Sequence, residues 1–145
     1  MVRLCSKFVL FACLGLLGFT AAPASAATLK ATVDLSKQRM YVFVDGRKKY
    51  SWPVSTGKRG WRTKTGYYTP FAQRKSFYSS KWRMSLPYLT MIGRDGTAIH
   101  GTYLTSRLGR PASHGCIRLS VGNAAKFYKL VQNHGFWSTQ IHVQP

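Results

Sequence analysis

Short segments in which apolar and polar residues alternate set the strongest limit on how this chain can fold. The first covers residues 29–35, and its apolar members are Leu29, Ala31, Val33 and Leu35. A period of two suits a strand with one buried face. A second alternating segment covers 50–54, and the apolar run 40–44 before it ends in Asp45-Gly46, a pair typical of tight hairpin turns. These patterns predict an antiparallel hairpin early in the fold.

The rest of the chain favours further strands and one helix. We expect a strand near 67–71, a hairpin from 88–92 to 97–100 through Asp95-Gly96, and a last strand at 140–143. Pro53 cannot donate a ladder hydrogen bond, which predicts an edge or bulged strand there. Ser120 is a good N-cap and Gly135 a good stop for a helix whose apolar face carries Ala124, Phe127, Leu130 and Val131. The sequence therefore predicts one mainly-β domain with a single C-terminal helix.

The first 26 residues have the pattern of a secretory signal peptide. Arg3 and Lys7 precede an uncharged apolar run at 8–22, and Ala24-Ser25-Ala26 has the small residues of a cleavage site. The run has 15 residues, fewer than the ~20 that span a bilayer. We expect cleavage after residue 26, no stable membrane insertion afterwards, and a mature domain at 27–145.

The charge balance excludes several classes of chemistry. The chain has 22 Lys and Arg residues, 3 acidic residues and a formal net charge of +19. A glycosidase needs facing carboxylates, and a calcium site needs several acidic oxygens. Asp34, Asp45 and Asp95 are too few and too scattered for either, and Asp45 and Asp95 stand in Asp-Gly turn pairs.

Removal of the signal peptide would leave one cysteine. Cys5 and Cys13 lie in the first 26 residues, so Cys116 alone would remain and no intramolecular disulfide could form. One interpretation is a buried cysteine packed as a small apolar residue. The other is a reactive thiol, since an unused free thiol is a liability in an oxidising compartment.

The chemically informative stretch is residues 99–119. His100 closes a predicted strand, and Ser113-His114-Gly115-Cys116 follows a glycine-containing loop. An imidazole that accepts the thiol proton makes cysteine a good nucleophile, and Cys116 and His100 are both expected at the surface of a cleft. Cysteine-dependent acyl transfer is one hypothesis. The alternatives are a core cysteine with two satisfied histidines and a zinc site made of His100, His114 and Cys116.

The segment from His100 through Ser113-His114-Gly115-Cys116-Ile117-Arg118 resembles the signature of the L,D-transpeptidase catalytic-domain family (YkuD-type). The resemblance extends to Pro53–Gly57 and to the Thr65-Gly66-Tyr67-Tyr68 segment, and it covers about Ala27–Gln144. Arg118 stands where part of the family has Asn. The resemblance implies a β-sandwich with one C-terminal helix packed near the catalytic loop.

The resemblance also implies a role for each residue of the motif. Cys116 would be the nucleophile, His100 its general base, and the Gly101 backbone carbonyl would orient the imidazole. His114 and Gly115 would support the oxyanion hole. Ser113 would shape the loop, and Arg118 would hold a substrate carboxylate. The implied chemistry needs no metal and no cofactor.

The implied substrates are peptidoglycan stem peptides. A tetrapeptide stem would acylate Cys116 with release of D-Ala, and an acceptor amine would then form a 3→3 cross-link. Water as acceptor would give an L,D-carboxypeptidase, and an amine of an outer-membrane or surface protein would attach that protein to the wall. These roles imply a periplasmic, wall-associated enzyme.

The stretch 58–83 combines basic and aromatic residues that could line or flank the cleft, or form a solvated basic face. They are Lys58, Arg59, Trp61, Arg62, Lys64, Arg74, Lys75, Phe77, Tyr78, Lys81, Trp82 and Arg83. Two rival functions compete with acyl transfer. A secreted basic nuclease would use His100 and His114 as an acid–base pair, although export argues against a nucleic-acid partner. A non-catalytic cationic module would bind the wall without using Cys116.

Overall fold

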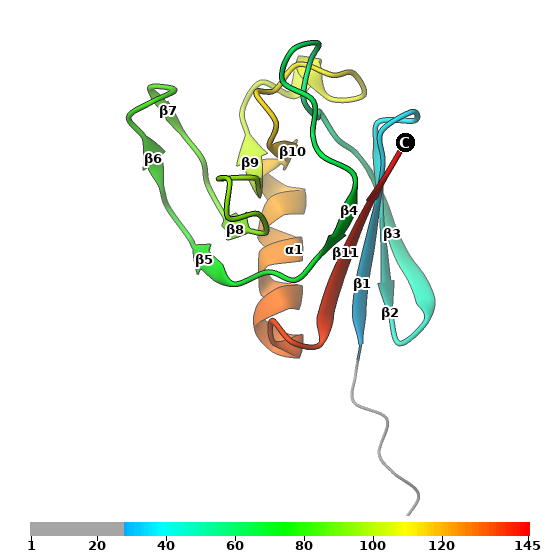
Figure 1. Cartoon of the computed structure of the whole chain (residues 1–145). Helices are drawn as coiled ribbons and strands as arrows, with labels where there is room; N and C mark the ends of the chain where they lie inside the picture. Colours follow the sequence, from blue (N-terminus) through cyan, green and yellow to red (C-terminus); the bar gives the residue numbers. More distant parts are fainter. Residues whose placement is uncertain (1–27) are drawn as a thin grey trace, which may run out of the picture.

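The computed structural model describes residues 28–145, which form two main β-sheets and one α-helix (Figure 1). The segment predicted to be a signal peptide lies outside these residues. Within residues 28–145, no helix is long and apolar enough to cross a membrane.

The first sheet has five strands in the order β3-β2-β1-β11-β4. Its bounds are β1 Leu29–Asp34, β2 Arg39–Val44, β3 Arg47–Pro53, β4 Gly66–Tyr68 and β11 Thr139–Gln144. The predicted hairpin is confirmed as β2–β3, which turns at Asp45-Gly46. β3 is an edge strand that ends at Pro53, so the edge position expected of this proline is confirmed. The pairing also shifts register at Val42/Phe43, away from Pro53.

The second sheet has the order β10-β9-β8-β5 and carries the motif. Its strands are β5 Ala72–Arg74, β8 Leu89–Met91, β9 Ala98–Thr102 and β10 Ile117–Ser120. β8 and β9 form the predicted antiparallel hairpin through Asp95-Gly96. β9 and β10 run parallel, and a short 3₁₀ helix, Thr105–Arg107, lies in their connection.

Helix α1, Val121–His134, packs against the second sheet and reaches the first. Asn123 N–H donates to the Ser120 side chain at its N-terminus, and Gly135 ends it, as predicted. α1 contacts β9 and β10 and also touches β1 and β8, and Figure 1 shows it running alongside both sheets. Ala124, Phe127 and Val131 are buried in a core shared with both sheets, whereas Leu130 is half-buried at its edge. The predicted mainly-β fold with one helix near the motif is confirmed.

The structure differs from the sequence expectation in two places between β3 and β8. The strand expected at 67–71 is shorter, Gly66–Tyr68, because Pro70 has no N–H with which to continue the ladder. The stretch after it, for which no strands were predicted, contains β5 and a two-stranded hairpin, β6 Tyr78–Ser79 with β7 Met84–Ser85. This β6–β7 hairpin projects from the body of the molecule (Figure 1).

Candidate active site

The pairing of β9 with β10 brings the motif histidine and the motif cysteine to one face of the second sheet. In the parallel register, His100 is opposite Arg118 and Ile99 is opposite Ile117. Cys116 precedes Arg118 by two residues, and a strand repeats its side-chain direction every second residue. Their side chains accordingly meet: His100, Cys116 and Arg118 all line one small cavity of about 20 Å³.

His100 is held by its own neighbour. Its Nδ1 lies 2.8 Å from the Gly101 carbonyl oxygen, which can only accept a hydrogen bond, so Nδ1 carries the proton and Nε2 keeps a free lone pair. Only 2% of His100 is exposed, which corrects the expectation that this residue lies at a cleft surface. Burial, opposed by the Gly101 hydrogen bond and aided by Arg118, lowers the pKa of His100 to about 4. The imidazole is therefore neutral at pH 7.

Cys116 is half-buried and lies just before β10. Its Sγ donates a long hydrogen bond to the Gly96 carbonyl, with 3.7 Å between sulfur and oxygen. Burial raises the pKa of the Cys116 thiol, while a backbone hydrogen bond from Ala98 and the charge of Arg118 lower it by smaller amounts. The site thus holds a neutral thiol and a neutral imidazole that line the same cavity.

Ser113 fixes the turn that presents Cys116. It is fully buried, and its Oγ donates to the Cys116 carbonyl at 2.6 Å while accepting from the Gly115 N–H at 3.1 Å. Gly115 has a φ of +109°, a conformation that favours glycine. The Gly115 N–H is already used inside the turn, which leaves the Gly115 amide less suited to an oxyanion than the family resemblance implies.

A second loop braces this turn from outside. Thr63 Oγ1 donates to the Gly115 carbonyl at 2.9 Å and accepts from the Gly57 N–H at 2.9 Å. A Cβ on Gly57 would come within 1.8 Å of the Trp61 carbonyl oxygen, so the loop closes only over glycine. The sequence alone does not predict a role for Thr63, because its burial within a basic loop is visible only in the fold.

His114 lies in an aromatic cluster. Its ring stacks on Trp82 at 4.1 Å with planes 1° apart, and Trp61 meets both rings edge-on, at 5.1 Å from His114 and 5.4 Å from Trp82. Burial, followed by the charges of Lys58 and Arg118, lowers the pKa of His114. Trp82 comes from the turn of the β6–β7 hairpin, so this projecting hairpin and the motif loop touch through stacked rings.

A pocket of about 420 Å³ opens beside Cys116. Part of the predicted basic and aromatic stretch lines it, namely Trp61, Arg62, Lys64, Lys81 and Trp82. The connection between β8 and β9 adds Asp95, Gly96 and Thr97. The sequence predicts Asp95-Gly96 only as a turn and Thr97 only as the start of a strand. Arg74 lies instead in a separate pocket between β5 and α1.

Arg118 is a buried cation with few partners. It is 7% exposed, its Nε has no hydrogen-bond partner among residues 28–145, and its Nη1 reaches the Ala112 carbonyl only at 3.5 Å. The two ion pairs in the described part of the chain, Lys37–Asp34 and Lys64–Asp95, do not involve it. Burial lowers the pKa of its guanidinium. A buried cation without a carboxylate partner is poised for a bound anion.

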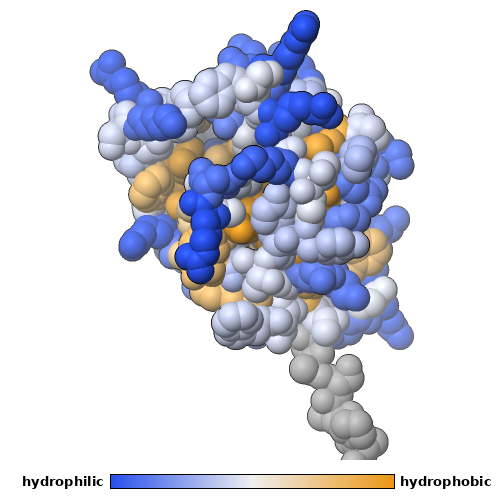
Figure 2. Space-filling view, in the orientation of Figure 1, coloured by the Kyte–Doolittle hydropathy of each residue, from blue (hydrophilic) through white to orange (hydrophobic). Residues whose placement is uncertain are grey.

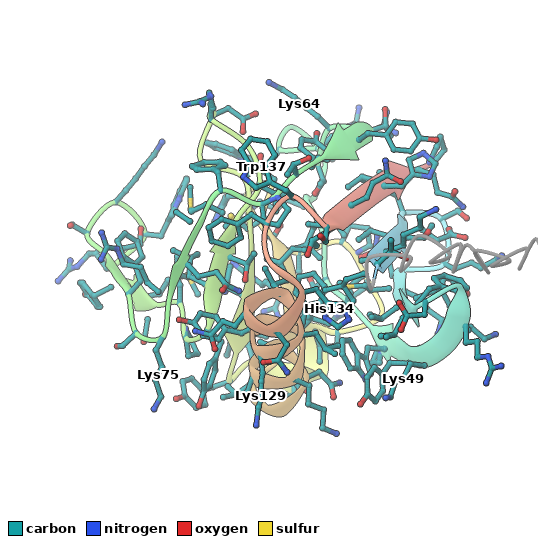
Figure 3. The ribbon with its side chains drawn as sticks, turned by 90° about the horizontal axis from the view of Figure 1, so that it is seen from below. Lys49, Lys64, Lys75, Lys129, His134 and Trp137 are labelled. Atoms are coloured by element: carbon teal, nitrogen blue, oxygen red, sulfur yellow. The ribbon has the colours of Figure 1, made fainter. Side chains whose placement is uncertain are left out.

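The remaining basic side chains are spread around the molecule. Figure 2 shows long hydrophilic side chains projecting from several parts of one face, with hydrophobic patches between them. In Figure 3, Lys64 lies at the upper edge of the view, and Lys75, Lys129 and Lys49 are spread along the lower edge. Basic side chains are therefore spread over the surface and are not confined to the pocket beside Cys116.

The geometry also bears on the zinc hypothesis. In residues 28–145, no group of three or more His, Cys, Asp or Glu side chains is close enough together to hold a metal ion. His100, His114 and Cys116 share the small cavity but do not form such a group.

Comparison with known proteins relates this arrangement to one family. The model of the YkuD L,D-transpeptidase catalytic domain matches residues 29–140. The fold is similar to an L,D-transpeptidase from Mycobacterium smegmatis (TM-score 0.75, 24% identity, covering 82% of this chain and 59% of that one). It is also similar to one from Stackebrandtia nassauensis (TM-score 0.71, 25% identity, 90% and 62%).

A third similar structure is L,D-transpeptidase 3 from Mycobacterium tuberculosis in complex with a faropenem-derived adduct (TM-score 0.71, 22% identity, 82% and 61%). The present chain thus spans about three fifths of the length of these solved chains. Comparison with curated protein sequences found no match.

Proposed function

Since this chain belongs to the YkuD family of L,D-transpeptidase catalytic domains, we propose that it is an exported peptidoglycan L,D-transpeptidase with Cys116 as nucleophile. The observation that carries the proposal is the His100 Nδ1–Gly101 oxygen hydrogen bond of 2.8 Å. It leaves Nε2 unprotonated in a cavity that Cys116 also lines, which is the arrangement a cysteine acyltransferase needs.

The first half-reaction begins from the neutral pair. The Cys116 thiol gives its proton to Nε2 of His100 as Sγ attacks the carbonyl between the L-centre of the diamino acid and D-Ala. Arg118 favours the thiolate electrostatically. Collapse of the tetrahedral intermediate breaks the carbon–nitrogen bond, His100 returns the proton to the leaving amine, and D-Ala departs from a thioester.

The second half-reaction regenerates the thiol. An acceptor amine attacks the thioester, a carbon–nitrogen bond forms, and the carbon–sulfur bond breaks. His100 takes the proton that the amine loses and passes it to Sγ. With a neighbouring stem the product is a 3→3 cross-link, with a surface protein it is an attachment to the wall, and with water the enzyme acts as an L,D-carboxypeptidase.

His114 and Arg118 support the first step together with the backbone amide of Cys116. We assign the oxyanion role to the Cys116 N–H, with His114 nearby, because the Gly115 N–H already donates to Ser113 Oγ. Arg118, buried and short of partners, holds a stem-peptide carboxylate through its planar guanidinium. Residues 1–26 direct export, after which the domain works in the periplasm.

Intact-mass spectrometry tests the reaction class. Purified domain incubated with a disaccharide-tetrapeptide is expected to release D-Ala and to gain the mass of the remaining acyl group on Cys116. Cys116→Ser should gain none, and Ser80→Ala, in the hairpin turn, serves as the matched control. Since a related fold was solved with a faropenem-derived adduct, faropenem is a second probe of the same cysteine.

The rival functions give different results. A nuclease would degrade nucleic acid and keep that activity in Cys116→Ala. A non-catalytic wall-binding module would bind sacculi equally well as wild type and Cys116→Ala, and neither would form a thioester. Absence of an acyl-enzyme in the wild type, with sacculus binding intact, would overturn the proposed function.

A further inference from the structure

The pocket beside Cys116 contains one carboxylate among several cations. Arg62, Lys64 and Lys81 line it, and Asp95 is the one acidic side chain among its lining residues in the described range 28–145. An acceptor amine is a cation in neutral water, because primary aliphatic amines titrate well above pH 7. Three cations repel such a group, so a favourable place for it must lie beside Asp95.

Asp95 uses its two carboxylate oxygens differently. Oδ1 accepts from the Thr97 N–H at 3.1 Å and from Thr97 Oγ1 at 2.8 Å, which fixes the carboxylate on the turn. Oδ2 faces Lys64 Nζ at 3.1 Å. The Thr97 side chain, with Lys64 and the Thr97 backbone, lowers the pKa of Asp95 to about 2. Asp95 is therefore anionic at neutral pH.

The ion pair with Lys64 is one that a competitor can displace. The Lys64 side chain is 73% exposed and that of Asp95 is 42% exposed, and ion pairs in such positions contribute little to stability. Lys64 ends in a primary ammonium on a flexible chain, and in Figure 3 it lies at the edge of the molecule. Its ammonium shows that the Oδ2 position accepts the functional group that an acceptor amine carries.

This position is also next to the nucleophile. Cys116 Sγ donates to the carbonyl of Gly96, the residue after Asp95. Asp95 is close enough for its charge to raise the pKa of Cys116. A group bound at Oδ2 thus lies in the same pocket as the thioester that Cys116 would carry.

We propose that Asp95 Oδ2 binds the primary ammonium of the acceptor substrate, and that Lys64 occupies this position until the acceptor displaces it. The inference rests on the proposed transpeptidase function and adds an acceptor site to it. Asp95 is here a substrate-binding residue for the second half-reaction, and it acts on the first only through its small effect on the Cys116 pKa.

Protons and bonds balance in this step. The ammonium held by Asp95 releases one proton to water, and the resulting neutral amine attacks the thioester carbonyl. The new carbon–nitrogen bond forms as the carbon–sulfur bond breaks. The second amine proton goes to His100 Nε2 and then to the Cys116 sulfur, so Asp95 ends the cycle unchanged.

The decisive variant is Asp95→Asn. Asparagine keeps an Oδ1 that can accept from Thr97, so the turn is preserved and only the charge at Oδ2 is lost. We expect D-Ala release and thioester formation to stay close to the wild-type rate, because Asp95 is the weakest of the influences on the Cys116 pKa. The KM for the acceptor tetrapeptide should rise roughly three- to tenfold, as fits a partly exposed charge pair. The ratio of transfer to hydrolysis should fall accordingly.

Lys64→Met tests the competition in the other direction. Removal of the internal ammonium should lower the acceptor KM by roughly two- to fivefold, with thioester formation unchanged. Asp45→Asn is the matched control, since Asp45 also stands in an Asp-Gly turn and accepts a backbone hydrogen bond, from Thr28 N–H at 2.9 Å, but does not line the pocket. It should leave both half-reactions as in the wild type.

The outcomes separate this inference from the proposed function. If Asp95→Asn forms the thioester normally and keeps the wild-type acceptor KM, the acceptor site is wrong and the transpeptidase proposal stands. If thioester formation falls as much as transfer, Asp95 acts on the nucleophile or its loop, and the acceptor role is again wrong. If the wild type forms no thioester, the proposed function fails and this inference fails with it.

Discussion

His100 Nδ1–H donates to the carbonyl of the next residue, Gly101, at 2.8 Å, and this short contact sets the protonation state on which the proposed chemistry depends. A carbonyl takes the place that a carboxylate occupies in other triads. It orients the ring without adding a negative charge to stabilise an imidazolium. In a buried position this leaves the His100 pKa low.

The first prediction concerns how the rate of Cys116 alkylation depends on pH: it should show no plateau from a preformed thiolate–imidazolium pair. The His100 pKa is about 4, and burial raises the pKa of Cys116 above its ordinary value. Both side chains are therefore neutral at pH 7. We expect alkylation of Cys116 by iodoacetamide to rise along one alkaline limb, and the acid limb of kcat/KM for acylation to lie near pH 4 to 5. A plateau of fast alkylation around pH 6 would show a preformed ion pair and contradict this prediction.

The second prediction concerns stability in acid. The His100 pKa falls from its ordinary 6.5 in the unfolded chain to about 4 in the folded one, so the unfolded state binds more protons between these values. The contribution of His100 to the free energy of unfolding is therefore fully present above pH 6.5. It declines by about 3 kcal/mol as the pH falls towards 4. Urea unfolding of the wild type at pH 7 and pH 4 should show the decline.

The control for this linkage is His100→Gln, which cannot titrate in that range. Its free energy of unfolding should lose less between pH 7 and pH 4 than the wild type does. His134→Gln, at the C-terminal end of α1, should show the same decline in the free energy of unfolding as the wild type. An equal decline in His100→Gln and wild type would show that other groups cause it.

The third prediction is that Cys116→Ser and His100→Gln each abolish turnover and that the double variant is scarcely worse than either single variant. The two residues act as one unit in proton transfer and attack, and such effects do not add. Glutamine is preferred to alanine because His100 is buried, and alanine would leave a cavity that destabilises the domain. Tetrapeptide turnover, with circular dichroism as the folding check, measures this. Turnover near wild type in either single variant would remove that residue from its role.

Much of the fold could be predicted because its strands are locally marked. The alternation at 29–35, the Asp-Gly turns and the capping pair Ser120 and Gly135 act through neighbouring residues, and β1, β2–β3, β8–β9 and α1 form where those signals stand. The β6–β7 hairpin could not be predicted in this way. Its strands have two residues each, too short for periodicity, and the stack of Trp82 on His114 accompanies it from 32 positions away in sequence.

The candidate site was predictable in its residue types and less so in their environments. Cys116, the one cysteine in residues 28–145, and the histidine before it stand out in the sequence. The burial of His100 instead follows from the packing of β9 between β8 and β10 under α1. Asp95 was recognised only as a turn residue. Its place in the pocket depends on the β8–β9 hairpin ending beside Cys116, which is a long-range relationship.

The last prediction separates stability from activity at Arg118. The guanidinium is 7% exposed, and its Nε has no partner within residues 28–145. Burying a poorly paired cation costs stability, and an apolar side chain of similar length in its place is often neutral or stabilising. Arg118→Met should therefore unfold at the same temperature as the wild type or higher, in thermal denaturation at pH 7.

Activity should change in the opposite direction. A charge-assisted hydrogen bond to a stem-peptide carboxylate contributes roughly 1.5–3 kcal/mol, so Arg118→Met should lower kcat/KM for the tetrapeptide donor about 10- to 100-fold. Alkylation of Cys116 by a small neutral reagent should slow much less, because Arg118 makes only a minor contribution to the Cys116 pKa. Arg118→Lys keeps the charge but loses the planar fork and should recover part of the loss. Equal losses in donor turnover and in alkylation would mean that Arg118 supports the thiolate or the loop, and its substrate-binding role would be withdrawn.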